Sequence, residues 1–150
     1  MGTYVVHYYL WHKVEKIMKI GLVASAFDLL HPGHIMLLKD ARAQCAHLIA
    51  ALHTDPCIER PMKNKPSQSI LERYIQLDGC KYVDEIIPYD TESDLLNILT
   101  LKDVDIICLG SEYKGTEFTG KDLGIQAHFH QRNHNYSSSE LRERINTSLV

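Results

Sequence analysis

The chain has 150 residues, of which 45% are hydrophobic and 23% charged, and its formal net charge is −3 at pH 7. These values are ordinary for a single globular domain and exclude an intrinsically disordered chain. The slight acidic excess disfavours a general nucleic-acid binder, and every apolar run is far shorter than the roughly 20 residues of a membrane-spanning helix. We therefore expect a cytoplasmic protein that binds neither nucleic acid nor a membrane.

Residues 1–17 are expected to form an N-terminal extension, because the apolar pattern of a folded core begins at Met18. Apolar runs of strand length then follow one another at 19–25, 47–53, 83–88, 104–109 and, more weakly, 125–130. Helical spacing or a helix-capping pattern separates them, over 31–45, over 69–78, from Thr91 and from Ser137. This alternation predicts one α/β domain over residues 18–150, with a Rossmann-like, doubly wound parallel sheet and helices on both faces.

The first loop of such a sheet carries the most informative residues. Ligands bind beyond the carboxyl ends of the strands, and the strand at 19–25 leads into His31-Pro32-Gly33-His34. Two histidines three positions apart lie on neighbouring positions of one helix face. Gly33 leaves room for a phosphate or another backbone, and the N-terminus of a helix attracts anions. The pattern predicts a polyphosphate site.

The segment 26–34 (AFDLLHPGH) resembles the (G/S)(T/C)FDxxHxGH signature of the cytidylyltransferase-like nucleotidyltransferases, the HxGH superfamily, and among them the glycerol-3-phosphate cytidylyltransferases. Three further segments match that family in order. They are a lysine-bearing loop at 63–65, an ER…YVDE stretch at 72–85 and, at 132–139 (RNHNYSSS), a form of the RTxGISTT motif. The resemblance covers about residues 18–146.

The resemblance implies that a phosphate oxygen of an acceptor attacks the α-phosphorus of a nucleoside triphosphate and expels pyrophosphate. Transfer of CMP from CTP to a small phosphorylated alcohol, such as glycerol 3-phosphate, is the first interpretation. Gly110-Ser111 stands where the family has Gly-Asp, and 110–120 also resembles the heptose-phosphate adenylyltransferases. The alternative is therefore an ATP-dependent adenylyltransferase acting on a sugar phosphate. Mg²⁺, carried mainly by the triphosphate, is the implied cofactor, and a homodimer the implied assembly.

The resemblance also implies roles for individual residues. His31 and His34 would contact the phosphates around the reacting phosphorus, and Lys63 would approach the α-phosphate or the acceptor phosphate. Arg132 would hold the β- and γ-phosphates through its planar guanidinium. The other nucleotide-binding positions would be Ala26, Phe27, Asp28, Gly33, Gly110, Ser137, Ser138 and Ser139. The acceptor would be bound by Lys65 and Arg73.

Simpler roles remain open for several of these residues. Lys63 and Lys65 could be solvated loop charges, Ser137 could be only a helix cap, and Asp28 could order its loop. Arg73 could pair with Glu72 or Asp78 on the helix surface. His128 and His130 share one strand face, but the sequence offers them no third metal ligand, so no protein-bound metal is expected.

Overall fold

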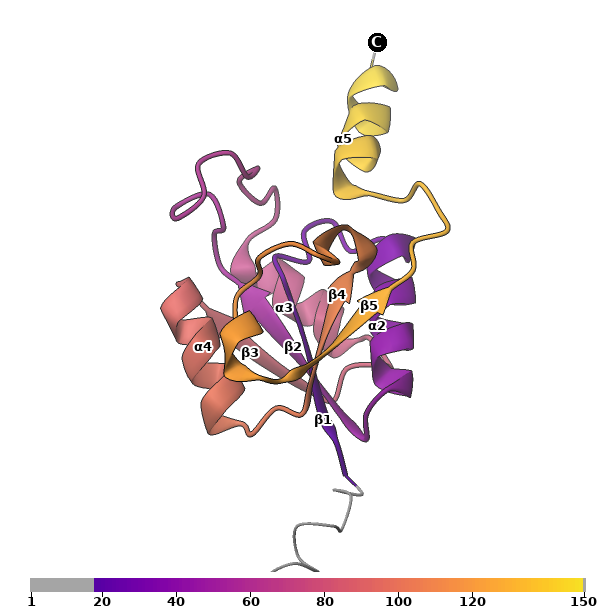
Figure 1. Ribbon diagram of the computed structural model, residues 1–150. Coiled ribbons are helices and arrows are strands. Elements are labelled where there is room, and N and C mark those ends of the chain that lie inside the picture. The colour runs from indigo at the N-terminus through magenta and orange to yellow at the C-terminus, as the bar shows by residue number, and fades with distance from the viewer. Residues whose placement is uncertain (1–17, 150) are drawn as a thin grey trace, which may run out of the picture.

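The computed structural model describes residues 18–149, and the predicted N-terminal extension 1–17 lies outside the described residues. Five parallel strands form one sheet in the order β3-β2-β1-β4-β5 (Figure 1). The strands are β1 (Ile20–Ser25), β2 (His47–His53), β3 (Glu85–Tyr89), β4 (Ile106–Gly110) and β5 (Gln126–His130). The helices are α2 (Pro32–Ala43), α3 (Ile70–Asp78), α4 (Glu92–Leu101) and α5 (Ser138–Thr147). Two 3₁₀ turns, Ser111–Tyr113 and Lys121–Leu123, lie between β4 and β5.

The helices cover both faces of the sheet, as predicted. Successive residues of a strand point to opposite faces, and Leu22 and Val23 of β1 accordingly belong to two different cores. Val23 packs in the core that contains Leu38 of α2 and Leu77 of α3. Leu22 packs in the core that contains Leu95 and Leu99 of α4. The doubly wound α/β prediction is confirmed.

Two strands begin two residues later than their apolar runs predict. The backbone N–H of Asp84 donates to Leu48 O, and the Asp84 carboxylate accepts from Leu48 N at 2.8 Å. Asp105 does the same with Ile20, whose N–H it accepts at 2.8 Å. Each aspartate thus makes a side-chain bond where a strand would make a backbone bond, which delays the start of β3 and β4. Pro88 is accommodated because β3 is an edge strand.

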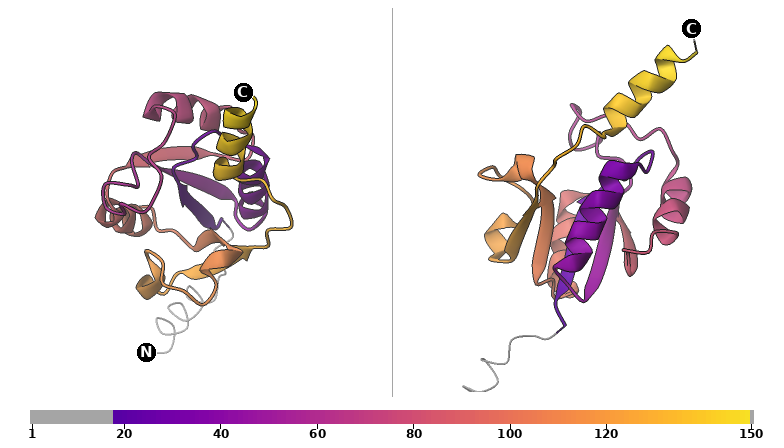
Figure 2. Two further views of the ribbon diagram at one scale, coloured as in Figure 1. Left: turned by 90° about the horizontal axis from the view of Figure 1, so that it is seen from above. Right: turned by 90° about the vertical axis from the view of Figure 1, so that its right-hand side faces the viewer.

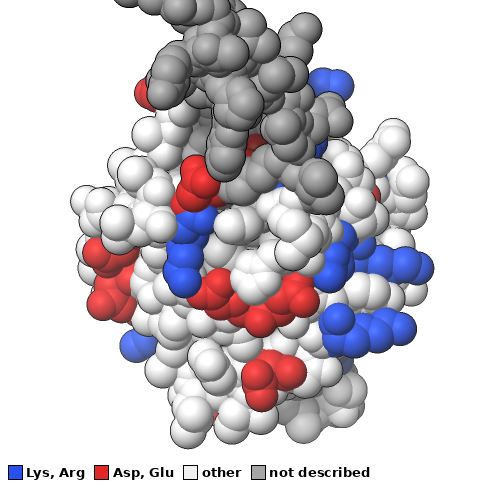
Figure 3. Space-filling view, turned by 90° about the horizontal axis from the view of Figure 1, so that it is seen from below, with Lys and Arg blue, Asp and Glu red and all other residues white. Residues whose placement is uncertain are grey.

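The strand order reverses between β1 and β4, and this is where sheets of this kind bind ligands. The loop after β1 is strained there, because Phe27 and Leu29 have positive φ angles of 48° and 51°. Helix α5 begins above this edge and projects away from the sheet (Figures 1 and 2), with none of its residues buried. The opposite end of the molecule carries a band of acidic side chains flanked by basic ones (Figure 3). Within residues 18–149, no helix has the length and apolar character needed to cross a membrane.

Candidate nucleotide site

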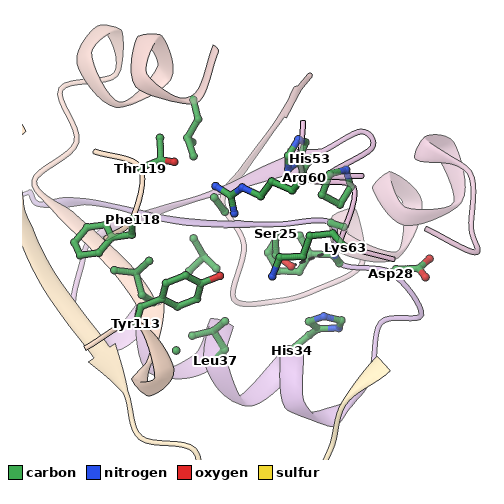
Figure 4. A pocket seen from close by; sticks show the side chains of 18 of the residues that line it. Ser25, Asp28, His34, Leu37, His53, Arg60, Lys63, Tyr113, Phe118 and Thr119 are labelled. Carbon is green, nitrogen blue, oxygen red and sulfur yellow. Dashed lines mark hydrogen bonds between the residues drawn. The ribbon is translucent and has the colours of Figure 1, made fainter. Parts of the chain in front are cut away.

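Two adjoining hollows lie at the carboxyl edge of the sheet. The main cavity has a volume of about 500 Å³ and lies between the loop after β2 and the segment after β4 (Figure 4). A second cleft of about 240 Å³ lies between the start of α2 and the segment after β5. The two share the residues Ser25, His34, Leu37, Gly110, Glu112 and Ser138.

Most of the predicted site residues line one of these hollows. The main cavity is lined by Ala26, Phe27, Asp28, His34, Lys63, Gly110, Ser138 and Ser139. The second cleft adds His31, Gly33, Arg132 and Ser137. Lys65 and Arg73 line neither of them. The structure thus brings together twelve positions that are spread widely along the chain.

The two histidines cap helix α2 in an unusual way. His31 Nδ1 accepts the backbone N–H of Gly33 at 3.0 Å, and His34 Nδ1 accepts the backbone N–H of His31 at 3.4 Å. Their rings stack with centroids 3.9 Å apart. Because each Nδ1 is an acceptor, a neutral ring must carry its proton on Nε2. The cap therefore leaves two Nε2–H donors at the positive end of a helix.

The surroundings keep both rings neutral. Burial, followed by the nearby His31, lowers the pKa of His34 to about 3. Burial also lowers the pKa of His31, with Arg132 and His134 acting in the same direction. At neutral pH His34 is thus a neutral hydrogen-bond donor fixed in one tautomer. Fixed donors of this kind stabilise charge that develops on a phosphate without having to reorganise.

Gly33 admits a backbone segment. A Cβ atom at this position would lie 2.9 Å from Tyr136 O and 2.8 Å from the ring of His31, which is closer than real Cβ contacts allow. The segment 132–138 therefore rests directly on the start of α2. Arg132 donates to Tyr136 O at 2.5 Å, and Ser138 Oγ donates to Asp28 O at 3.0 Å. The two most specific sequence motifs are joined by these contacts.

The serines at the start of α5 have different tasks. Ser137 is the N-cap, and its hydroxyl accepts the backbone N–H of Glu140 at 3.1 Å. The hydroxyl of Ser138 is used by the bond to the backbone of Asp28. A ligand at this helix start would therefore meet the unpaired N–H groups of the first turn, which attract anions.

The loop after β2 supplies cations to the main cavity. Arg60 and Lys63 both extend into it from this loop, across from Tyr113 and Phe118 (Figure 4). Arg60 pairs with Glu92 at 2.9 Å, at the start of α4. Lys65 lines a different, shallower depression beside Arg142. Of the two lysines predicted in this loop, Lys63 lines the main cavity and Lys65 does not.

Asp28 organises the loop, as its simpler interpretation predicts. Its carboxylate is 5% exposed and accepts the N–H groups of Ser67 and Gln68 at 2.8 and 2.9 Å. It also pairs with the guanidinium of Arg142 on α5. Burial alone would raise the pKa of Asp28, but these backbone donors and Arg142 outweigh it and hold the pKa below its usual value. With its oxygens committed in this way, Asp28 joins three segments of the site.

The acceptor-binding role predicted for Arg73 does not fit its position. The residue is 2% exposed, and its guanidinium donates to backbone carbonyls. Its Nη1 bonds Ala26 O and His53 O at 2.9 and 2.7 Å, and its Nη2 bonds Thr54 O at 2.7 Å. Its Nε bonds the carbonyls at the start of α3. Arg73 therefore ties together the loops after β1 and β2, and Glu72, its expected surface partner, caps α3 instead.

Replacing Arg73 by lysine is expected to destabilise the fold by about 2–3 kcal/mol, because one ammonium cannot satisfy carbonyls on three segments. Denaturant unfolding measures the effect, and Arg144→Lys on the exposed side of α5 is the matched control. When the variant is assayed well below its melting temperature, its KM for the acceptor should stay near the wild-type value. An Arg73→Lys variant with wild-type stability and a raised KM for the acceptor would instead show that Arg73 binds the substrate.

Sequence reasoning missed several groups at the site. Arg142 lies in no recognised motif, while His134 and Glu112 lie in matched segments in which neither was singled out as a site residue. Among the described residues, His53, Glu59 and Glu92 form a group whose ligand atoms lie within 4.8 Å of one another. Glu92 already pairs with Arg60 and accepts from Thr119. A cation at this group would have to displace Arg60 from Glu92.

Comparisons with known proteins show the family to which the chain belongs. A family model described as cytidylyltransferase-like matches residues 22–144. The bifunctional protein HldE of Caulobacter sp. (strain K31) is 33% identical over 107 residues, which are 71% of this chain and 22% of that protein. HldE of Helicobacter pylori (strain HPAG1) is 31% identical over 128 residues, or 85% of this chain and 27% of that protein. The chain thus spans about a quarter of these relatives.

Solved structures share the fold. The lipopolysaccharide core biosynthesis protein from Thermoplasma volcanium superposes with a TM-score of 0.56 at 22% identity, covering 89% of this chain and 90% of that one. A pantothenate synthetase from Thermus thermophilus gives a TM-score of 0.58 at 14% identity, covering 84% of this chain and 64% of that one. At these identities the likeness concerns the fold alone.

Proposed function

Since the chain belongs to the cytidylyltransferase-like family of nucleotidyltransferases, we propose that it transfers a nucleotidyl group from a nucleoside triphosphate to a small phosphorylated acceptor and releases pyrophosphate. One observation carries this proposal. The stacked pair His31 and His34 presents two Nε2–H donors beside the segment 132–138, in the second cleft, which shares lining residues with the main cavity. Two adjoining hollows suit two phosphorylated substrates.

In the proposed step, an acceptor phosphate oxygen forms a bond to the α-phosphorus. The bond from that phosphorus to the bridging oxygen breaks, and its electron pair leaves with pyrophosphate. His31, His34 and Lys63 would stabilise the charge around the α-phosphorus, mainly by fixed position. Arg132 and the start of α5 would hold the leaving pyrophosphate.

Mg²⁺ would be carried mainly by the triphosphate and would reduce the negative charge that the leaving group has to bear. Of the carboxylates at the site, Glu112 is the one that would be available to this metal. Glu112 is the acidic residue common to the main cavity and the second cleft among the described residues. Asp28, by contrast, is already engaged by Arg142. The donor set thus fits a metal held chiefly by substrate.

CTP with glycerol 3-phosphate is the first substrate pair, and ATP with a sugar phosphate is the second. A specific observation favours the second pair. Beyond Lys63 the main cavity continues to Arg60, Glu92 and Thr119 and is walled by Tyr113 and Phe118. Charged and hydroxyl groups beside aromatic rings suit a molecule with several hydroxyls. The similarity to the HldE proteins supports the same choice.

Pyrophosphate release measured with ATP, CTP, GTP and UTP, each with glycerol 3-phosphate and with heptose and hexose phosphates, tests both pairs. Turnover that needs one triphosphate and one phosphorylated acceptor together is expected. Activity with ATP and a sugar phosphate would select the second pair, and activity with CTP and glycerol 3-phosphate the first. Absence of turnover in all combinations, from folded protein, would contradict the proposed reaction.

Arg132→Lys should weaken triphosphate binding or turnover by about tenfold or more, because lysine keeps the charge but loses the planar fork that binds two oxygens. The apparent affinity for the acceptor should change little once the nucleotide is saturating. Initial rates with each substrate varied in turn separate the two effects, with Arg144→Lys as control. If only the KM for the acceptor changed, Arg132 would bind the acceptor and not the triphosphate.

A further inference from the structure

Two buried ring nitrogens in the second cleft lack hydrogen-bond partners. Across residues 18–149 these two, His130 Nε2 and His134 Nε2, are the only buried side-chain nitrogens or oxygens in this condition. Both residues line the second cleft, with ring centroids 6.4 Å apart. An unsatisfied buried polar atom destabilises the folded protein. Two of them in one cleft call for a common explanation.

The contacts of His130 determine what its free nitrogen can do. Asp40 Oδ2 lies 2.8 Å from His130 Nδ1 and 2.9 Å from His128 Nε2. Burial alone would raise the pKa of Asp40, but the bonds from both rings lower it, so the carboxylate is ionised and only accepts. His130 must therefore carry its proton on Nδ1. In the neutral ring, Nε2 is then a bare acceptor.

His134 has the opposite arrangement. Its Nδ1 accepts the backbone N–H of Tyr136 at 3.1 Å, and its ring stacks obliquely on that of Tyr136. The neutral ring consequently carries its proton on Nε2, which is a donor. The residues that line the cleft therefore hold one unpaired acceptor, at the end of β5, and one unpaired donor, in the segment that follows.

Resting on the proposed function, we propose that His130 and His134 together bind one ribose hydroxyl of the nucleoside triphosphate. A hydroxyl can donate to His130 Nε2 and accept from His134 Nε2–H at the same time. An ionised phosphate oxygen has no hydrogen to give, so it cannot satisfy the bare Nε2 of the neutral His130 ring. A metal ion would need a lone pair on the His134 nitrogen that already carries the proton.

The second cleft contains His31 and His34, where the proposal places the α-phosphate, and His134 lies close enough to His31 to lower the pKa of His31. The second cleft also contains Arg132 and Ser137, where the proposal places the pyrophosphate. In a nucleotide the group joined directly to the α-phosphate is the sugar. Because phosphate oxygens have no hydrogen to donate to the neutral His130 ring, the hydroxyl-bearing sugar is the group that fits the pair. The His130–His134 pair would thus distinguish ribonucleotides from deoxyribonucleotides.

The test compares the affinity of the intact chain for the preferred ribonucleoside triphosphate with its affinity for the 2′-deoxy and 3′-deoxy forms, by titration calorimetry. Wild type should bind the ribonucleotide at least about tenfold more tightly than one of the deoxy forms, since the deoxy form leaves both ring nitrogens unpaired. His130→Ala and His134→Ala should bring that ratio close to one, chiefly by weakening the ribonucleotide. His130→Phe and His134→Phe keep an aromatic ring but remove its nitrogens, and they should do the same if the alanine variants fold poorly.

His47→Ala, at the start of β2 and the far end of the sheet, is the control and should keep the wild-type ratio. A wild-type ratio of one, or a ratio unchanged in all the His130 and His134 variants, would overturn the inference while nucleotide binding itself survived. If the variants changed the preference among the four bases but kept the wild-type ratio of ribonucleotide to deoxyribonucleotide affinity, the inference would also be overturned. That result would show that His130 and His134 contact the base. Absence of binding by any triphosphate would instead overturn the proposed function, and this inference with it.

Discussion

His34→Ala is expected to lower kcat by about a hundredfold or more, because the loss of one fixed donor to a developing charge typically costs that much. The ring is held in place by the bond from His31 N, by stacking on His31 and by the side of Phe27, at centroid distances of 3.9 and 5.6 Å. A water molecule that fills the space left by the His34 ring in the alanine variant would lack these contacts, so it would not be a fixed donor. Steady-state rates with both substrates saturating measure the effect.

Two variants make this result specific. His47→Ala removes an imidazole from the same sheet far from the site and should leave kcat unchanged. His34→Gln keeps a neutral N–H donor in the cleft and should recover part of the lost rate. An alanine variant with at least half of the wild-type kcat would contradict the proposed role of the histidine pair.

The low pKa of His34 adds a pH dependence. Folded His34 stays neutral down to about pH 3, whereas an unfolded histidine is protonated below about pH 6.5. The unfolded state therefore binds more protons between these values, and stability falls as the pH is lowered through this window. Denaturant unfolding from pH 7 to pH 4 should show a smaller loss in His34→Gln than in wild type. An identical loss would mean that His34 is protonated in the folded protein.

The fold could be predicted from sequence because its signals are local. Apolar runs mark the strands, and Ser69, Thr91 and Ser137 each cap a helix through a bond to a residue three positions later. Where a predicted strand start is wrong, a side chain competes with the backbone. Asp84 and Asp105 do this by bonding residues 36 and 85 positions away. Spacing along the chain holds no information about such partners.

The site was predictable only where a motif carried it. His31 and His34 lie in a contiguous motif, but Arg142 meets Asp28 across 114 positions and belongs to no motif. Arg73 follows a capping glutamate on α3, so sequence alone could not tell a surface pair from a buried clamp. The hydrogen bonds to Asp40 and from the backbone of Tyr136 determine which ring nitrogen of His130 and of His134 carries the proton. In each case the missing information is the three-dimensional partner of a polar group.

Asp28→Ala is expected to destabilise the protein by about 3 kcal/mol, because it leaves the N–H groups of Ser67 and Gln68 and the charge of Arg142 without their acceptor. Denaturant unfolding measures the loss, with Asp78→Ala on the exposed end of α3 as control. Since the folded pKa of Asp28 is lowered, its contribution is present above the unfolded value near 3.9 and is lost as the pH falls through the folded value. Asp28→Asn should therefore reduce the loss of stability in acid.

Asp28→Ala should also weaken triphosphate binding, because it loosens the attachment of α5. None of the residues of α5 is buried, so the helix is held at the site mainly by the bonds of Ser138 and Arg142 to Asp28. Phe27 and Leu29, with their positive φ angles, stand on either side of this junction. Without the carboxylate the loop can relax, and the start of α5 is no longer fixed beside His31. Asp28→Ala and Arg142→Ala should thus both raise the KM for the triphosphate, and the double variant should be no worse than the poorer single one. Losses that add fully in the double variant would show that the two residues act on separate parts of the site.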